Sequence, residues 1–436
     1  MIAPEQQTPH ITYHTVTLGP LTHGGDARAE ITIQDDDGAT HTLALAVPAG
    51  LPGERVTIAY EPLPPPRTGR RHKHHRKPRP PRVWITEIHQ ASPLRVQAPC
   101  PVFGTCGGCQ LQHMRYEAQL EWKREVVRQL LDERGFNDPP LLPTVPCEPP
   151  WNYRNHMRFS VNREGQAGLT ARNSHRVLPL HNCPIAHEQI NRALVVLSQQ
   201  QNARPQVLIR CAAHSTQMLI QPQQPPEIVE QLAAAGLEIQ TETMEEQLAG
   251  ETFRIRPSSF FQTNTAQAEK MIQMVINGLL PTGNMSQHAQ APLTVVDAYC
   301  GVGTFALLLS KWVSRVIAIE ESASAIKDAR WNLRDANNVD IVQGKVEDEL
   351  PELAAQLDGL VIDPPRAGCQ PAILEALARH AVKRIVYVSC DPTTLARDLD
   401  ILCHQYQTYR LQSIQPLDMF PQTAHIENIA VLEHRD

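Results

Sequence analysis

The chain has 436 residues, enough for about three domains at roughly 150 residues each. Hydrophobic residues make up 42% of it, which is sufficient for sizeable cores. It contains no run of 18 apolar residues, and its start, MIAPEQQTPH, lacks a basic stretch followed by an apolar one. These features argue against a membrane span and a secretory signal. We therefore expect a cytoplasmic protein without a membrane partner, whose ten cysteines do not form a disulfide framework.

The charge is unevenly placed along the chain. The net charge is −6, yet residues 67–82 (RTGRRHKHHRKPRPPR) hold eight Lys and Arg, three His and no acid. Without that segment the balance is 32 − 46 = −14. An acidic body with one basic arm indicates local contact with a polyanion. A solvated, Pro-rich loop is the alternative, and the two can hold together because disordered basic arms also bind RNA.

The first 97 residues have the pattern of a small β domain. Short β segments, separated by Gly and Asp turns, predict a barrel of the size of an oligonucleotide-binding domain. The basic insert, residues 62–82, falls in the loop between the last two strands. The five segments are ITYHTVTLG, RAEITIQ, THTLALAVP, ERVTIAY and RVWITEIH.

Residues 98–280 form the predicted central α+β domain. It begins with the cysteine-rich stretch PCPVFGTCGGC, followed by an amphipathic helix over YEAQLEWKREVVRQLLDERG that Gly135 is expected to end. The later stretch WNYRNHMRFSVNREGQAGLTARNSHR carries five Arg against one Glu, with aromatic residues between them. Such a mixture can hold phosphates and stack bases, although an antiparallel sheet with one solvated face has the same pattern.

Residues 281–436 form the predicted third domain, which starts with the polar linker 281–292. Near-continuous apolar runs then alternate with helical stretches, as buried parallel strands with crossover helices do. The sequence therefore predicts an α/β, Rossmann-like doubly wound domain. The runs are LTVVDAYCG, RVIAIEE, GLVIDPP and RIVYVSCDP.

The first of these strands leads into a glycine turn, DAYCGVGTF. Gly301 and Gly303 allow the backbone to approach a ligand, and Glu320 ends the next strand, where an acid can bind ribose hydroxyls. The third glycine of the dinucleotide fingerprint is replaced by Ala306. S-adenosylmethionine, which has no pyrophosphate, therefore fits better than a nicotinamide dinucleotide. A structural glycine turn is the alternative.

The third strand ends in the motif DPPR, residues 363–366. Enzymes that methylate amines have a similar motif, but an aromatic residue follows their two prolines and stacks on the target. Arg366 cannot take that part in the same way, so we expect the methyl group to go to another kind of atom.

The fourth strand runs into YVSCDPTTLARDL. Asp391 is a good helix N-cap and Pro392 suits the first helical position, which places Cys390 at the amino end of a helix. We expect the helix dipole to lower the pKa of its thiol and make it a nucleophile. The alternative for a lone cysteine is core packing.

A thiolate beside a methyl donor suits uracil chemistry. Carbon 5 of uracil is a poor nucleophile, but thiolate addition at carbon 6 creates an enolate that can accept a methyl group. A base must then remove the carbon-5 proton so that the thiolate can leave. Glu427 is the candidate base, with His425 two residues earlier in MFPQTAHIENIAVLE.

Together these motifs resemble the RNA uracil-C5 methyltransferases. The matching stretches are FRIRPSSFFQTN, DAYCGVGTF, DPPRAG, SCDP and FPQTAHIEN. The resemblance implies Cys390 as nucleophile, Glu427 as proton acceptor and Asp363 as a contact to both uracil and donor. It also implies that the contacts to S-adenosylmethionine are Gln262, Tyr299, Gly301, Thr304, Glu320 and Asp363.

The N-terminal half resembles one branch of that family. LPGERV and SPLRV are similar to parts of the RNA-binding TRAM domain. The resemblance also implies that a four-iron four-sulfur cluster is held by Cys100, Cys106, Cys109 and Cys183. Structural zinc is the alternative metal. The spacing differs from that of radical enzymes, so a structural or RNA-positioning role is expected. We interpret the remaining cysteines as packing residues: Cys147, Cys211, Cys300, Cys369 and Cys403.

A TRAM domain together with a cluster is typical of the ribosomal RNA branch. The expected substrate is thus a uridine of 23S ribosomal RNA, single-stranded or flipped out of its stack. No obligate protein partner is evident. The alternatives are the same chemistry on tRNA and a non-catalytic RNA-binding or assembly factor.

Overall fold

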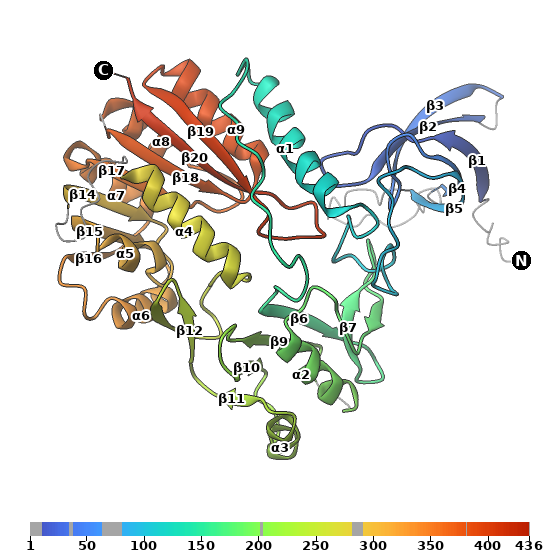
Figure 1. Ribbon diagram of the computed structural model, residues 1–436, viewed down its shortest axis with the longest axis horizontal. Helices are drawn as coiled ribbons and strands as arrows, with labels where there is room; N and C mark the ends of the chain where they lie inside the picture. The colour runs from blue at the N-terminus through green and yellow to red at the C-terminus, as the bar shows by residue number, and fades with distance from the viewer. Residues whose placement is uncertain are drawn as a thin grey trace, which may run out of the picture. The chain divides into compact units, whose positions relative to one another are not determined.

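The computed structural model describes residues 11–34, 38–62, 81–200, 204–280, 291–380 and 382–435 (Figure 1). Most of the basic insert and of the polar linker lies outside these ranges. The chain divides into two compact units. Unit 1 is Met1–Ala118 with Gln422–Ala424, and unit 2 is Gln119–Pro421 with His425–Asp436. The division into three domains stays a prediction. No helix within the described ranges is long and apolar enough to cross a membrane.

Unit 1 contains five strands at the predicted positions. Strand β1 pairs with β4 and β4 with β5 in an antiparallel three-stranded sheet, while β2 and β3 form a separate antiparallel pair. Side chains along β2 alternate between buried and exposed, as a half-buried strand requires. A closed TRAM barrel stays a prediction. The strands are β1 (Thr12–Thr17), β2 (Ala27–Gln34), β3 (Thr40–Val47), β4 (Arg55–Glu61) and β5 (Arg82–Gln90).

A buried ion pair joins the two TRAM-like motifs. Arg95 of SPLRV donates to both carboxylate oxygens of Glu54 of LPGERV, at 2.5 and 2.6 Å. Glu54 is fully buried and also accepts the backbone N–H groups of Leu51 and Ser92. Although burial opposes ionisation, these bonds lower the pKa of Glu54 below its usual value. The two motifs are therefore held together by one bidentate contact.

Unit 2 begins with α1 (Tyr116–Asp132), whose first residues belong to unit 1. The predicted helix is confirmed, and Gly135 follows it with a φ of 80°. A six-stranded sheet comes next, in the order β11-β10-β9-β6-β7-β8, with α2, α3 and the hairpin β12-β13. These elements are β6 (His156–Val161), β7 (Ala167–Thr170), β8 (Val177–Pro179), α2 (Glu188–Ser198), β9 (Gln206–Cys211), β10 (Gln217–Gln221), α3 (Pro226–Ala234), β11 (Glu238–Gln240), β12 (Met244–Leu248) and β13 (Glu251–Ile255).

The predicted α/β domain is a seven-stranded sheet in the order β16-β15-β14-β17-β18-β20-β19. The first five strands in that order are parallel, whereas β20 is antiparallel to both of its neighbours. The strands are β14 (Ala291–Ala298), β15 (Val313–Glu320), β16 (Val339–Gln343), β17 (Gly359–Ile362), β18 (Arg384–Ser389), β19 (Tyr409–Leu417) and β20 (Glu427–His434).

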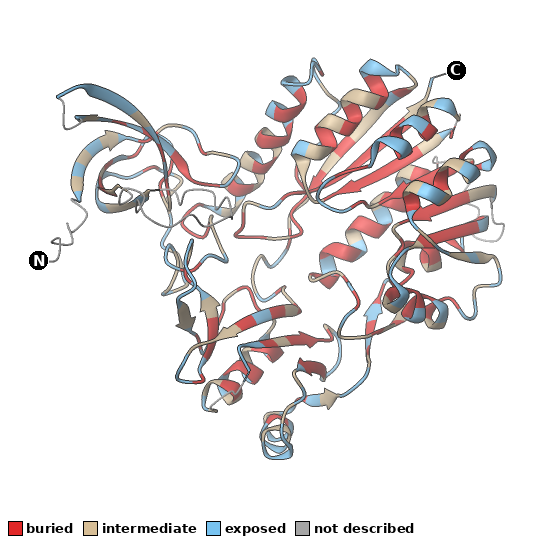
Figure 2. Cartoon of the chain, turned by 180° about the vertical axis from the view of Figure 1, so that it is seen from behind, coloured by how far each residue is buried: buried red, intermediate tan, exposed pale blue. Residues whose placement is uncertain are grey.

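Helices cover both faces of this sheet, because its strands are apolar on both sides (Figure 2). Ile385 and Tyr387 of β18 belong to one core cluster, and Val386 and Val388 belong to the other. Residues of α1, α7, α8 and α9 line the first cluster, and those of α4, α5 and α6 line the second. The helices not yet given are α4 (Thr265–Leu279), α5 (Thr304–Leu309), α6 (Ala323–Asn332), α7 (Val346–Leu353), α8 (Pro371–Arg379) and α9 (Pro392–Asp400), with a 3-10 turn at Ala354–Gln356 and a π turn at Ile401–Gln405.

Candidate active site

Three predicted site residues meet at the edge of the sheet where the parallel strands end. Asp363 directly follows β17, and Cys390 directly follows β18. Glu427 is the first residue of β20, which runs the opposite way, and the pairing of Ser389 with Asn428 sets it level with the end of β18. Both carboxyl groups are close enough to raise the pKa of the Cys390 thiol. The fold therefore brings a thiol and two acids together at the edge where open α/β sheets bind ligands.

The expected lowering of the Cys390 pKa is wrong for the structure as it stands. Burial, followed by the charges of Glu427 and Asp363, raises the pKa of this thiol to about 11, and Arg366 only partly opposes the rise. The helix end gives little help because its N–H groups already have an acceptor. The carboxylate of Asp391 accepts the N–H groups of Thr393 and Thr394, at 2.9 and 3.3 Å. The cap that starts the helix thus takes the donors that would stabilise a thiolate.

The two acids are also perturbed. Burial raises the pKa of Asp363 to about 7. Burial, with the charge of Asp363, raises the pKa of Glu427 well above its usual value, and Arg366 lowers it in part. The charges of both acids thus disfavour ionisation of Cys390, and the charge of Asp363 disfavours ionisation of Glu427. Arg366 is a cation that lowers the pKa of both Cys390 and Glu427. The DPPR motif did not predict this role.

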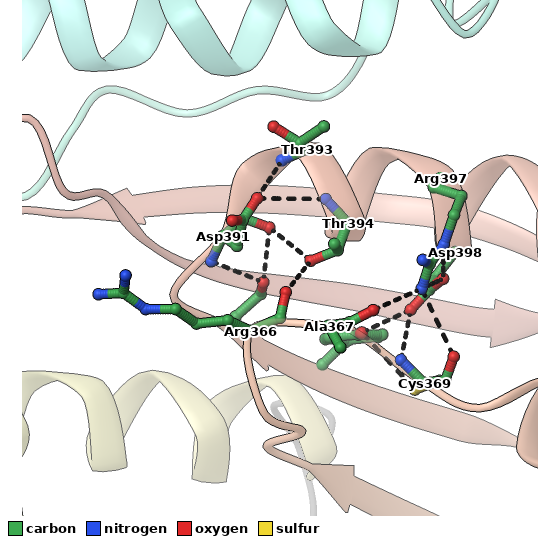
Figure 3. A network of polar contacts seen from close by, with 10 residues as sticks. Arg366, Ala367, Cys369, Asp391, Thr393, Thr394, Arg397 and Asp398 are labelled. Atoms are coloured by element: carbon green, nitrogen blue, oxygen red, sulfur yellow. Dashed lines mark hydrogen bonds and ion pairs between the residues drawn. The ribbon is translucent and has the colours of Figure 1, made fainter. Parts of the chain in front are cut away.

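Helix α9 holds the DPPRAG loop in place through hydrogen bonds (Figure 3). Thr394 donates its hydroxyl to the carbonyl of Arg366 at 3.2 Å, and Arg397 donates to that of Ala367 at 2.9 Å. The buried carboxylate of Asp398 accepts the N–H of Cys369 and the hydroxyl of Tyr387, both at 2.8 Å. The loop that carries Asp363 and the helix that follows Cys390 are therefore one hydrogen-bonded assembly.

The glycine turn predicted to bind S-adenosylmethionine, residues 297–305, has a strained backbone. Tyr299, Gly301 and Gly303 all have positive φ, of 63°, 58° and 87°. Glu320 accepts the N–H of Gly301 at 3.0 Å, which ties the loop to the end of β15. A Cβ added to Gly301 would meet nothing within 4 Å, so the space beside this backbone can admit a ligand. Positive φ at a non-glycine residue is uncommon and is concentrated at ligand-binding sites.

Three other residues lie in this loop or are predicted to bind the same donor. Thr304 is the first residue of α5. Asp297, which we did not assign, is fully buried and accepts the N–H of Ala306 at 2.8 Å. Burial raises its pKa to about 8. Gln262 lies before α4, and its carbonyl accepts the side chain of Asn155 at 3.3 Å. Hydrogen bonds therefore connect the Gly301 N–H to the Glu320 carboxylate and the Asn155 side chain to the Gln262 carbonyl.

The predicted cluster ligands fall in both units. Cys100, Cys106 and Cys109 belong to unit 1 and Cys183 to unit 2. Cys106 accepts the N–H of Gly108 at 3.4 Å, a contact that suits a thiolate ligand. Within the described ranges, however, no three His, Cys, Asp or Glu side chains are grouped as a metal site requires. The five cysteines predicted to pack are all buried: Cys147, Cys211, Cys300, Cys369 and Cys403.

Comparison with known proteins agrees with the motifs. Residues 227–356 and 350–435 match the family model described as tRNA (Uracil-5-)-methyltransferase. An uncharacterized RNA methyltransferase of Listeria innocua is 34% identical over 409 residues, covering 80% of this chain and 87% of the relative. One of Gloeobacter violaceus is 33% identical and covers 96% of each chain. The chain belongs to the RNA uracil-C5 methyltransferase family. Members of this family use S-adenosylmethionine to methylate uracil in RNA, and this protein is such an enzyme.

A solved structure shows the same fold over almost the whole chain. The tRNA (uracil-54, C5)-methyltransferase of Pyrococcus abyssi, in complex with S-adenosyl-L-homocysteine, superposes with a TM-score of 0.67 and 22% identity. The match covers 96% of this methyltransferase and 100% of the archaeal chain. The predicted α/β methyltransferase fold is confirmed.

The raised pKa of Cys390 can be tested by alkylation. At pH 8 a thiol with a pKa of about 11 is ionised in about one molecule in a thousand, so iodoacetamide should label it slowly and ever faster up to pH 10. Arg366→Gln removes the cation that lowers this pKa, and labelling at pH 8 should slow by about threefold. Mass spectrometry of the peptide that contains Cys390 reads the rate, with Arg379→Gln on α8 as a control. Rapid labelling at pH 7 would contradict the account.

Proposed function

We propose that the enzyme methylates carbon 5 of a uridine in 23S ribosomal RNA through a covalent bond between Cys390 and carbon 6. The observation that carries this proposal is the meeting of Cys390, Asp363 and Glu427 at one edge of the sheet. A thiol, a carboxyl group that is partly ionised near neutral pH and a buried second acid are the groups that this reaction needs.

The first step is the addition of the Cys390 sulfur to carbon 6. The thiol is protonated in the free enzyme, so its proton must leave as the carbon–sulfur bond forms. Asp363, with a pKa of about 7, is partly ionised at neutral pH and lies within electrostatic reach of the sulfur. We therefore assign Asp363 as the acceptor of that proton, in addition to a contact with the uracil ring.

The second step is the release of the product. S-adenosylmethionine, when bound, supplies an electrophilic methyl group that carbon 5 takes up. Glu427 in its ionised form then removes the carbon-5 proton, the double bond re-forms and the carbon–sulfur bond breaks, which returns Cys390 as a thiolate. Burial among apolar groups makes the Glu427 carboxylate a stronger base than an exposed one.

The donor is proposed to lie along the glycine turn. Tyr299, Gly301 and Thr304 would line it, with Glu320 at the ribose hydroxyls and Gln262 at the far side. The open space at Gly301 supports this placement. Because the Glu320 carboxylate accepts two backbone N–H groups, those of Gly301 and Ser322, it is held at the end of β15 before any ligand arrives.

The central sheet is proposed to contact the RNA backbone. Arg154 just before β6 and His156 and Arg158 of β6 are half-buried or exposed, while Asn155 and Met157 between them are buried. The alternation puts three basic or polar groups on one face of the strand. Arg210 of β9 is paired with His156 across the sheet, but it is buried and donates to the carbonyl of Ser259, so it supports this face from within. Such a face suits phosphate groups.

Ribosomal RNA is the proposed substrate because the chain has the TRAM-like strands and the four spaced cysteines. We likewise propose a cytoplasmic location and an iron–sulfur cluster on Cys100, Cys106, Cys109 and Cys183, with zinc as the alternative. The rival substrate is tRNA, which the matching family model and the Pyrococcus abyssi enzyme name in their descriptions.

The chemistry is tested by two substitutions. Cys390→Ala should lower methylation by about a thousandfold or more while RNA binding is kept. Glu427→Gln should slow release by about a hundredfold to ten-thousandfold, the usual contribution of a general base. The variant should therefore accumulate a covalent protein–RNA adduct on denaturing gels. Undiminished turnover by Cys390→Ala would remove the nucleophile, and normal product from Glu427→Gln would remove the base.

The substrate is tested by transfer of a labelled methyl group. Unmodified 23S RNA and bulk tRNA, each from cells that lack the gene, are incubated with the enzyme and labelled S-adenosylmethionine. We expect 5-methyluridine in the 23S RNA and none in tRNA. Label in tRNA alone would overturn the ribosomal assignment and leave the chemistry standing.

The cluster is tested by metal analysis of protein that is purified without oxygen. About four iron per chain and a brown colour are expected, and Cys106→Ser should lose both. The matched control is Cys211→Ser, at a buried cysteine outside the proposed ligand set. A colourless protein that contains zinc would contradict the iron–sulfur assignment.

A further inference from the structure

The segment that connects β19 to β20 is held by an unusual row of hydrogen bonds. Four successive backbone carbonyls, those of residues 418–421, each accept a hydrogen bond from a different side chain. The donors are Gln267 to Asp418 at 2.9 Å, Asn264 to Met419 at 3.0 Å, Lys123 to Phe420 at 3.2 Å and Tyr153 to Pro421 at 3.0 Å. We call the four donor residues, Lys123, Tyr153, Asn264 and Gln267, the clamp.

The clamp is fully enclosed. Lys123 and Asp418 are each completely buried, and the Lys123 ammonium lies 2.5 Å from the Asp418 carboxylate. Asn264, Gln267 and Tyr153 are also buried. A buried ion pair contributes little net stability over well-packed hydrocarbon, since both charges lose their hydration. The pair instead fixes the position of the segment, because the Lys123 ammonium donates to both a carboxylate and a carbonyl of that segment.

The clamped segment adjoins the proposed base. Leu417, the residue before Asp418, is the antiparallel pairing partner of Glu427 and the last residue of β19. The N–H of Asp418 donates to the carbonyl of Val145, and the N–H of Val145 donates to the carbonyl of Pro416. The end of β19 is thus fixed on both sides of Leu417. Because Glu427 is paired to that residue, a shift of the clamped segment moves the Glu427 carboxylate.

Cys390 is held by a different set of contacts. It lies between β18 and α9, where Ser389 donates its hydroxyl to the carbonyl of Asp391 at 3.0 Å and the Asp391 carboxylate caps the helix. None of the clamp donors takes part in these bonds. Damage to the clamp should therefore move the base with little effect on the nucleophile.

We propose that the clamp is a positioning network for Glu427, and that it governs removal of the carbon-5 proton rather than attack by Cys390. The inference rests on the proposed function, because it needs the two steps to be carried by these two residues. Asn264 is the N-cap of α4, two residues after Gln262, and Gln267 lies in its first turn. The same helix start therefore supports the proposed donor contact and the segment that places the base.

The test separates the two steps in the full-length enzyme. With a 23S fragment and S-adenosylmethionine, rapid denaturation measures how fast the covalent adduct forms, and 5-methyluridine release measures how fast it resolves. Lys123→Met keeps the length of the side chain but loses its donors. We expect adduct formation to stay within about threefold, while resolution slows by about tenfold to a hundredfold, as a displacement of the order of 1 Å predicts. The adduct should accumulate.

Two further variants keep the outcome clear. Tyr153→Phe removes one hydrogen bond without leaving a buried charge, so it tests the clamp even if Lys123→Met fails to fold; about threefold slower resolution is expected. Arg192→Met is the matched control, because Arg192 of α2 also donates to a carbonyl, that of Ala235, at 3.2 Å. Its adduct should form and resolve at the unsubstituted rates.

Each result decides one claim. If Lys123→Met and Tyr153→Phe slow both steps equally, or neither, the clamp is structural only and the inference is overturned. Melting temperatures measured alongside show whether a loss of stability accompanies the effect. If the unsubstituted enzyme forms no adduct and no 5-methyluridine, the proposed function itself has failed, which is a separate outcome.

Discussion

The antiparallel pairing of β20 with β18 is the constraint on which the candidate site depends. A parallel strand would present its first residue at the opposite edge of the sheet, far from the ends of β17 and β18. Because β20 runs the other way, its first residue, Glu427, meets Cys390 and Asp363. The nucleophile and the proposed base of this two-step reaction therefore come from strands that run in opposite directions.

Burial of the site raises the pKa of the Cys390 thiol and so lowers its reactivity when no substrate is bound. The pKa of Cys390 is raised to about 11 and that of Asp363 to about 7, so the thiol is protonated in the free enzyme. A protonated thiol resists oxidation and random alkylation. Ionisation is then coupled to formation of the carbon–sulfur bond, which needs an acceptor nearby. Arg366, the cation that acts on both Cys390 and Glu427, moderates the effect of the two acids.

Sequence reasoning gave the parallel strands and the helix starts, because apolar runs and capping residues are local signals. Asp391 and Pro392 begin α9 as predicted. The same reasoning gave the wrong direction for the Cys390 pKa, since it could not weigh burial and two neighbouring carboxyl groups against a helix end. Arg366 and Asp297 were not assigned because their parts depend on three-dimensional neighbours.

The clamp was also beyond the reach of the sequence. Lys123 lies in an ordinary amphipathic helix, 295 residues before the Asp418 that it binds. Nothing in its local pattern distinguishes it from the lysines and arginines on solvated helix faces. Long-range contacts of this kind are seen only in the folded structure, and they include contacts that position a catalytic group.

The most direct measurement uses RNA in which the target uridine carries fluorine at carbon 5. Fluorine cannot be removed as a proton, so the enzyme should stop after methyl transfer with the RNA still attached. Mass spectrometry should find the methylated, fluorinated nucleotide on the peptide that contains Cys390, at up to one per chain and only when S-adenosylmethionine is present. A nucleotide attached to another cysteine, or none at all from an active enzyme, would contradict the account.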